Sequence, residues 1–212
     1  MNVVLFVGSP RATSNTRSMA AFLSARLAER DIQPIVLDAK RPTLDEAFVT
    51  RSIDAIRDAD ALVLMAPVYL DLPPHVALSW MHAIRERREG LGEASPSVYA
   101  ISHSGYFEPI HKDVSIEAIR HFVRRMGWGW NGALRFGGTS PIDGKPLEEA
   151  GPFSAKVRPA LVRLADLIAK RRPIPIDLAR AASRRPIPLP TRWIVWLMNA
   201  YLRSVSKRAT QR

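Results

Sequence analysis

The chain has 212 residues, of which 47% are hydrophobic and 24% charged, and its formal net charge is +11. A chain of this length and composition can bury a core of its own as one domain of α/β size. It contains no cysteine, which excludes disulfides, thiolate catalysis, iron–sulfur clusters and zinc sites with cysteine ligands.

The positive charge is concentrated in one part of the sequence. Residues 171–212 carry a net charge of +9, whereas residues 1–170 carry only +2. Basic segments of this kind bind phosphates, membranes or nucleic acid, and a solvated tail is an equally good interpretation. The sequence shows no signal-peptide pattern and no apolar run of the ~18 residues that span a bilayer, so a soluble cytoplasmic protein is expected. The five histidines form no metal-binding spacing, and no metal site is predicted.

Short apolar runs alternate with helical patterns along the first 170 residues. The runs predict strands at 2–8, 33–39, 61–66, 97–102 and, more weakly, 133–137. The 3.6-residue spacing of apolar side chains predicts helices at 15–30, 44–59, 73–89, 115–126 and 153–170.

This alternation implies a parallel sheet with right-handed crossover helices. Five strands and five helices match the α/β, flavodoxin-like doubly wound fold, with a five-stranded parallel sheet in the order 2-1-3-4-5. Ligands of such sheets bind beyond the carboxyl ends of the strands, where the first and third strands lie side by side. The loops after strands 1, 3 and 4 are therefore the places to look for a site.

The loop after the first strand, GSPRATSNT at residues 8–16, is rich in hydroxyl groups. It is neither the GxGxxG turn of dinucleotide sites nor the GxxxxGK[ST] loop of nucleoside triphosphate sites. It combines hydroxyls, the Arg11 guanidinium and the first amides of a helix, which together suit a terminal phosphate. The alternative is a helix cap formed by Ser14 or Asn15, which explains only one or two of these residues.

Three segments together resemble a known family. They are GSPRATSNT at 8–16, DALVLMAPVY at 60–69, and SGYFEP at 104–109 followed by FVRRMGWGWNG at 122–132. In this order they resemble the NAD(P)H-dependent FMN reductases and quinone reductases of the flavodoxin-like superfamily, and the resemblance covers residues 2–170.

The resemblance implies an FMN site built from three loops. The residues that would hold the FMN phosphate are Ser9, Arg11, Ser14, Asn15 and Thr16. Those that would lie along the isoalloxazine edge are Pro67, Val68, Tyr69 and Leu70. Those that would close the other side of the ring are Ser104, Gly105 and Tyr106. No catalytic side chain is predicted, because in such enzymes the cofactor carries the chemistry. Asp71 has no assigned role, and His103 is interpreted as a hydrogen-bonded histidine at a strand end, with a proton donor as the alternative.

The implied function is transfer of hydride from NAD(P)H to FMN and of two electrons onward to a small-molecule acceptor, namely a quinone, a flavin or another compound. The resemblance also implies a homodimer. Two other functions stay open: a non-enzymatic flavodoxin-like electron carrier, and a flavodoxin-fold binding protein without flavin.

The predicted flavodoxin-like FMN-binding domain ends at residue 170, and residues 171–212 form a separate tail. The tail is predicted to be a proline-rich basic strap, with RRPIPI and RRPIPLP repeated, followed by an apolar C-terminal helix at 191–207. Most of the circumference of this helix is apolar, so something must cover it. Three coverings stay open: its own domain or a dimer partner, the flavin face, or peripheral contact with a membrane. Nucleic-acid binding is a weaker alternative.

Overall fold

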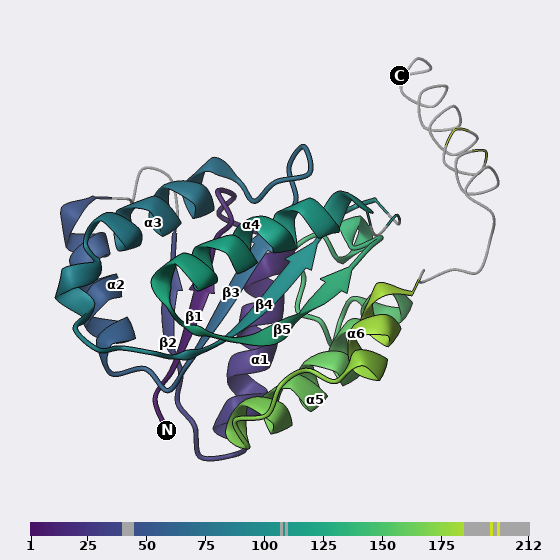
Figure 1. The fold of residues 1–212 in the computed structure, drawn as a ribbon. Helices are drawn as coiled ribbons and strands as arrows, with labels where there is room; N and C mark the ends of the chain where they lie inside the picture. Colours follow the sequence, from purple (N-terminus) through teal and green to yellow (C-terminus); the bar gives the residue numbers. More distant parts are fainter. Residues whose placement is uncertain (40–44, 107, 109, 185–195, 197–198, 200–212) are drawn as a thin grey trace.

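The computed structural model describes residues 1–39, 45–106, 108, 110–184, 196 and 199, and contains one five-stranded parallel sheet (Figure 1). The strands are β1 (Val3–Val7), β2 (Ile35–Asp38), β3 (Ala61–Pro67), β4 (Ser97–His103) and β5 (Gly129–Phe136). Their order in the sheet is β2-β1-β3-β4-β5. The predicted flavodoxin-like fold class is therefore confirmed.

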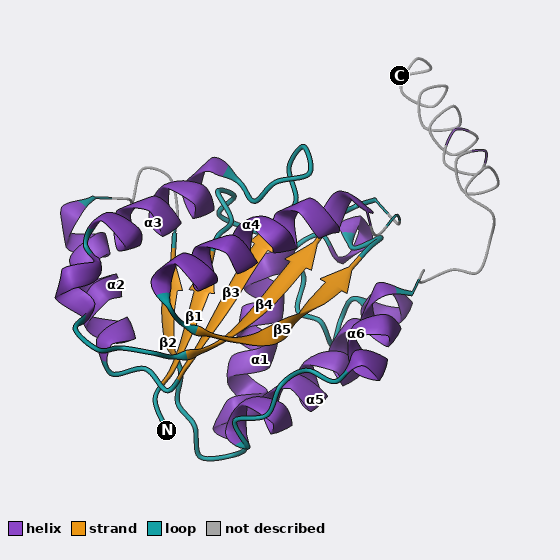
Figure 2. Cartoon of the chain, viewed as in Figure 1, coloured by secondary structure: helices purple, strands orange, loops and turns teal. Residues whose placement is uncertain are grey.

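The helices cover both faces of the sheet (Figure 2). One face is covered by α1 (Asn15–Ala28), α5 (Val157–Ala169) and α6 (Ile176–Ser183). The other is covered by α2 (Glu46–Arg57), α3 (His75–Glu86) and α4 (Ile110–Met126). Because every strand except the edges is buried on both faces, the strands read as continuous apolar runs rather than alternating ones.

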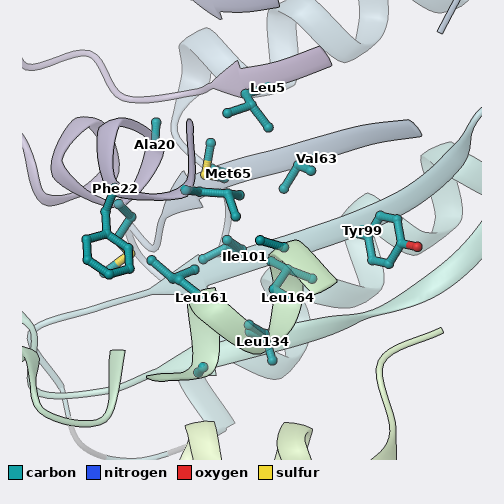
Figure 3. Packing of buried hydrophobic residues seen from close by; sticks show 14 of the residues in the cluster. Leu5, Ala20, Phe22, Val63, Met65, Tyr99, Ile101, Leu134, Leu161 and Leu164 are labelled. Carbon is teal, nitrogen blue, oxygen red and sulfur yellow. The ribbon is translucent and has the colours of Figure 1, made fainter. Parts of the chain in front are cut away.

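Alternate residues of each strand enter two separate cores. Leu5 and its neighbours on the same face pack with Phe22 of α1 and Leu161 of α5, as Figure 3 shows. Phe6 points to the opposite face and stacks on Trp80 of α3, with ring centroids 3.9 Å apart. These two cores fix the sheet between its helices and hold the carboxyl ends of the strands in place.

Three elements begin four or five residues away from their predicted start, whereas the other predicted elements begin within two residues of it. Strand β5 begins at Gly129, four residues earlier than predicted, because its first half is an edge segment in which a register shift and Gly132 (φ +105°) interrupt the apolar pattern. Helix α4 begins at Ile110 rather than at 115. Helix α5 begins at Val157, after a short 3₁₀ turn at Gly151–Ser154.

Helix α6 lies inside the segment predicted as a proline-rich strap. It starts directly after Pro175, and Leu178 and Ala182, one turn apart, are buried in the core with α5. The prolines around it concealed this short amphipathic pattern. Of the predicted C-terminal helix, only Trp196 and Asn199 belong to the described residues, and both are helical; the rest lies outside them. In the described part of the chain, no helix has the length and apolarity needed to cross a bilayer.

Candidate functional site

A cavity of about 480 Å³ opens at the carboxyl ends of the strands, beside the start of α1. This volume lies within the range of small-molecule sites. Its walls come from the loops after four strands. The lining residues are Ser9, Arg11, Thr13, Ser14, Asn15 and Thr16 after β1; Pro67, the last residue of β3, with Val68 and Tyr69; His103, the last residue of β4, with Ser104 and Gly105; and Thr139, Ser140, Asp143 and Gly144 after β5.

The cavity brings together all of the predicted cofactor-binding residues except Leu70 and Tyr106. Leu70 is 98% exposed and Tyr106 is 65% exposed, and neither lines the cavity. Leu70 directly follows the lining residue Tyr69, and Tyr106 directly follows the lining residue Gly105, so both are adjacent to the lining in the sequence. The roles of all these residues toward a cofactor stay predictions.

Residues with incompletely paired polar groups line the cavity just before and at the start of α1. Ser14 is the N-cap, and its hydroxyl accepts a hydrogen bond from the Arg17 amide at 3.3 Å. The hydroxyl of Ser9 is buried and has no hydrogen-bond partner among the described residues. The first amides of an α-helix have no partner within the helix, and the helix dipole favours an anion there. An anion bound at this end of the cavity would satisfy these groups.

Arg17 stabilises the loop after β1 through several hydrogen bonds. Its guanidinium donates to the carbonyl oxygens of Ser9 and Arg11 and to the Ser14 hydroxyl. It also pairs with the carboxylate of Asp38, at the end of β2, at 2.9 and 2.5 Å. Arg17 was not among the predicted site residues, and it shapes the loop rather than lining the cavity.

Asn15 connects the loop after β1 to the loop after β5. Its side-chain nitrogen donates to the carbonyl of Thr139 at 2.6 Å, and its side-chain oxygen accepts from the amide of Gly144 at 2.7 Å. Both ends of this side chain are thus paired within the protein, which leaves the Asn15 backbone amide, in the first turn of α1, for an anion.

The wall after β5 is the part of the site that sequence reasoning missed. A signal was present, because GGTS at residues 137–140 places small and hydroxyl residues directly after the fifth strand, at the same edge of the sheet. Gly144 has φ +71°, and a Cβ there would lie 2.4 Å from the Thr13 methyl carbon. The two loops therefore touch, and glycine is needed for the contact.

His103 lies beneath the cavity and is fully paired. Its Nε2 is 2.8 Å from the Thr16 hydroxyl, and its Nδ1 is 3.2 Å from the Thr139 hydroxyl. The Thr139 hydroxyl donates to the carbonyl of Ser104, so it accepts from Nδ1–H, and Thr16 donates to Nε2. This pattern assigns a neutral imidazole. Burial, with a smaller effect of the Lys112 charge, lowers the pKa of His103 to about 4. The structural interpretation of His103 is therefore favoured over a proton donor.

Asp71, which had no predicted role, belongs to a strained turn beside the cavity. Leu70 and Asp71 have φ values of +49° and +66°, and Tyr69 and Leu72 are joined by two backbone hydrogen bonds. Asp71 Oδ1 lies 2.6 Å from Nδ1 of His111 on α4. Residues other than glycine adopt a positive φ at an energetic cost, and the contact between Asp71 and His111 helps to stabilise this turn.

The sequence of residues 1–75 matches the family model described as NADPH-dependent FMN reductase. The predicted resemblance is thereby confirmed for this part of the chain, which includes the loops after β1 and β3. No curated protein sequence matches the chain.

Solved structures show the same fold. An NADH:FMN oxidoreductase (EMOB) in its apo form has a TM-score of 0.60 and 17% identity, over 90% of this chain and 97% of that one. A WrbA-like flavodoxin from Agrobacterium tumefaciens has a TM-score of 0.55 and 15% identity, over 81% and 98%. An NAD(P)H:quinone oxidoreductase from Methanothermobacter marburgensis has a TM-score of 0.53 and 18% identity, over 77% and 98%. The fold is flavodoxin-like.

The residues of the cavity fit FMN. The end of the cavity at the start of α1 suits a phosphate, and the buried Ser9 hydroxyl there has no hydrogen-bond partner among the described residues. The wall after β3 is apolar: Pro67 has no amide hydrogen, while the amides of Val68 and Tyr69 donate to the carbonyls of His103 and Leu72. A flat aromatic ring can pack on such a wall.

Proposed function

We propose that this chain is an FMN-dependent oxidoreductase that takes hydride from NAD(P)H and passes two electrons to a quinone, a flavin or another small acceptor. The observation that carries the proposal is that one cavity is lined both by the first turn of α1 with Ser9, whose buried hydroxyl has no partner among the described residues, and by the apolar wall at the end of β3. The match of residues 1–75 to the NADPH-dependent FMN reductase model supports FMN as the cofactor and NAD(P)H as the electron donor.

When bound, FMN supplies the redox chemistry, accepting a hydride and releasing two electrons. The protein binds and orients. Ser9, Ser14 and the amides of the first turn of α1 would hold the phosphate, and Arg17 keeps their loop in shape. Pro67 and Val68 would shield one edge of the ring from water. His103, neutral and fully paired, ties the loops after β1, β4 and β5 together rather than moving a proton.

The test is a comparison of FMN with riboflavin, which lacks the phosphate. Calorimetry is expected to show binding of FMN and much weaker binding of riboflavin. The Arg11→Met variant is expected to weaken FMN binding roughly ten- to a hundred-fold, because a charge-assisted hydrogen bond contributes about 1.5–3 kcal/mol. Arg120→Met is the matched control, since Arg120 pairs with Glu117 on the exposed side of α4.

Activity separates the proposed enzyme from the two alternatives. Steady-state oxidation of NAD(P)H in the presence of a quinone is expected for the enzyme. A protein that binds FMN without turning over nicotinamide would be an electron carrier. A protein that binds neither FMN nor riboflavin would be a binding protein without flavin, and the proposal would fail.

The proposal includes a homodimer in the cytoplasm. Tyr69, Leu70 and Tyr106 expose apolar surface at the opening of the cavity, where a partner subunit would complete the site. Light scattering coupled to gel filtration is expected to give twice the mass of the 23.7 kDa chain, and Leu70→Ser to shift it toward the monomer.

A further inference from the structure

Lys112 is a buried lysine that is not among the proposed cofactor-binding residues. It lies in the first turn of α4, and its side chain is fully buried, with 0% exposure. Removing an ammonium group from water is costly, and the positive end of the helix dipole adds to the cost. A cation at this position therefore needs strong compensation from its surroundings.

The compensation comes from the segment that follows β4. The ammonium donates to the hydroxyl of Ser104 at 3.3 Å, to the carbonyl of Tyr106 at 3.3 Å and to the carbonyl of Glu108 at 2.5 Å. An ammonium group has three donors and no acceptor, so three oxygen acceptors satisfy its charged form completely. Lys112 thus holds Ser104, Tyr106 and Glu108 around its ammonium group.

This segment is also a wall of the cavity. Ser104 and Gly105 line it, so the ammonium is one hydrogen bond behind the lining. A Cβ at Gly105 would lie 2.3 Å from the hydroxyl oxygen of Ser140, which shows how closely the segment fits against the loop after β5. Replacement of Lys112 is therefore expected to change the shape of the cavity wall at Ser104 and Gly105.

Other charged groups interact with Lys112, whose charge in turn, after the larger effect of burial, lowers the pKa of Lys156. Asp113 pairs with Arg135 at 2.8 Å, and His103 is neutral. Burial lowers the pKa of Lys112 and the Arg135 charge lowers it further, whereas the charges of Glu108 and Asp113 raise it. The two carboxylates thus favour the ammonium form of Lys112, and the Arg135 guanidinium disfavours it.

We propose that Lys112 positions the wall segment at residues 104–106 and 108 and, as a buried positive charge behind Ser104, stabilises reduced FMN relative to oxidised FMN. The inference rests on the proposed function. A hydride carries two electrons and one proton, so its uptake adds one negative charge to the occupant of the cavity. A fixed positive charge behind the wall favours the occupant that carries this additional charge.

The experiment compares Lys112→Gln and Lys112→Met with wild type and with Lys170→Gln. Lys170 is the control, because it is an exposed lysine at the end of α5 that does not line the cavity. The measured quantity is the midpoint potential of bound FMN, obtained by equilibrium reduction against a reference dye. Both Lys112 variants are expected to lower it by at least about 30 mV, which is a tenfold change in the ratio of the dissociation constants of oxidised and reduced FMN for a two-electron couple.

Lys112→Gln removes the charge but keeps a hydrogen-bond donor, so it separates charge from positioning. A variant that binds FMN and keeps the wild-type potential, or raises it, overturns the inference while leaving the proposed function intact. A wild-type protein that binds no FMN overturns the proposed function itself. If neither neutral variant folds, wild type decides: bound FMN is expected to have a higher potential than free FMN, and an equal or lower one contradicts the inference.

Discussion

Arg17 and Asp38 form a two-pronged ion pair, Nε to Oδ2 at 2.9 Å and Nη2 to Oδ1 at 2.5 Å, that joins α1 to the end of β2. Both side chains are largely shielded from solvent. The remaining donors of Arg17 reach the loop after β1, at Ser9, Arg11 and Ser14. The pair therefore fixes the loop that would bind the FMN phosphate in place relative to β2.

Removing this support is expected to weaken phosphate binding. Asp38→Ala leaves the Arg17 guanidinium partly buried without its carboxylate and lets the loop after β1 move. The loss of a charged hydrogen bond of about 1.5–3 kcal/mol predicts a roughly tenfold or greater fall in FMN affinity. Calorimetry with FMN and with riboflavin measures the effect, which should be confined to FMN.

Arg26→Met is the control for this change. Arg26 lies on the same helix and pairs with Glu29 on the surface, away from the cavity. It is expected to leave FMN affinity unchanged, since exposed ion pairs contribute little. Equal weakening of FMN and riboflavin by Asp38→Ala would mean that the pair supports the fold in general rather than the phosphate loop.

The buried hydroxyl of Ser9 gives a prediction in which stability and binding move in opposite directions. In the protein without FMN, this hydroxyl is buried and unpaired, which costs about 1–3 kcal/mol. Ser9→Ala is therefore expected to raise the free energy of unfolding of the FMN-free protein by about 1 kcal/mol and to lower FMN affinity. Urea denaturation and calorimetry measure the two effects.

Ser18→Ala serves as the comparison. The Ser18 hydroxyl is also buried in α1 but donates to the Ser14 carbonyl, so its removal is not expected to stabilise the protein. A Ser9→Ala protein that is less stable and binds FMN normally would show that the hydroxyl has a structural partner instead.

The sequence was informative where a side chain's type alone decides its place. Buried strands such as Val3–Val7 have no polar residue, and the hydroxyl-rich loop after them lies where the parallel topology requires. The predicted sheet order is confirmed for this reason. The loops after β1, β3 and β4 do meet at one cavity, although Leu70 and Tyr106 lie outside its lining.

What the sequence did not reveal depends on contacts between distant segments. The Asn15 side chain forms hydrogen bonds with Thr139 and Gly144, more than 120 positions away, and nothing near Asn15 in the sequence indicates these bonds. Lys112 occurs in a helix with exposed charged neighbours, and only the fold shows that its ammonium is enclosed by Ser104 and the carbonyls that follow. Helix α6 is short and depends on packing against β5 and α5 rather than on its own pattern.

The contact between the loops after β1 and β5 can be tested at Gly144. Gly144→Ala introduces a Cβ 2.4 Å from the Thr13 methyl carbon in addition to strain at φ +71°. Gly127→Ala, at φ +75° with nothing within 4 Å, introduces the strain alone, which costs about 1–2 kcal/mol. Gly144→Ala is expected to be clearly more destabilising and to weaken FMN binding, as measured by urea denaturation and calorimetry.

Adding Thr13→Ser, which removes the clashing methyl group, is expected to recover part of the loss in Gly144→Ala. Additive effects of the two substitutions would indicate that the loops are not in contact.

The neutral state of His103 predicts how stability depends on pH. The pKa of His103 is lowered from 6.5 to about 4 in the folded protein, so the unfolded chain binds a proton at higher pH than the folded one. Its contribution to stability is fully present above pH 6.5 and is lost as the pH falls toward 4. Between pH 6.5 and 5 the free energy of unfolding is expected to fall by about 2 kcal/mol on account of this group.

In His103→Gln this part of the pH dependence should disappear, because the amide can still bond to Thr16 and Thr139 but does not titrate. His75→Gln, a change at an exposed histidine on α3, should retain it. Urea denaturation of the three proteins at several pH values in this range measures the difference. Identical pH profiles for wild type and His103→Gln would mean that His103 titrates alike in the folded and unfolded states, and its pairing with the two threonines would then not be the state of the protein in solution.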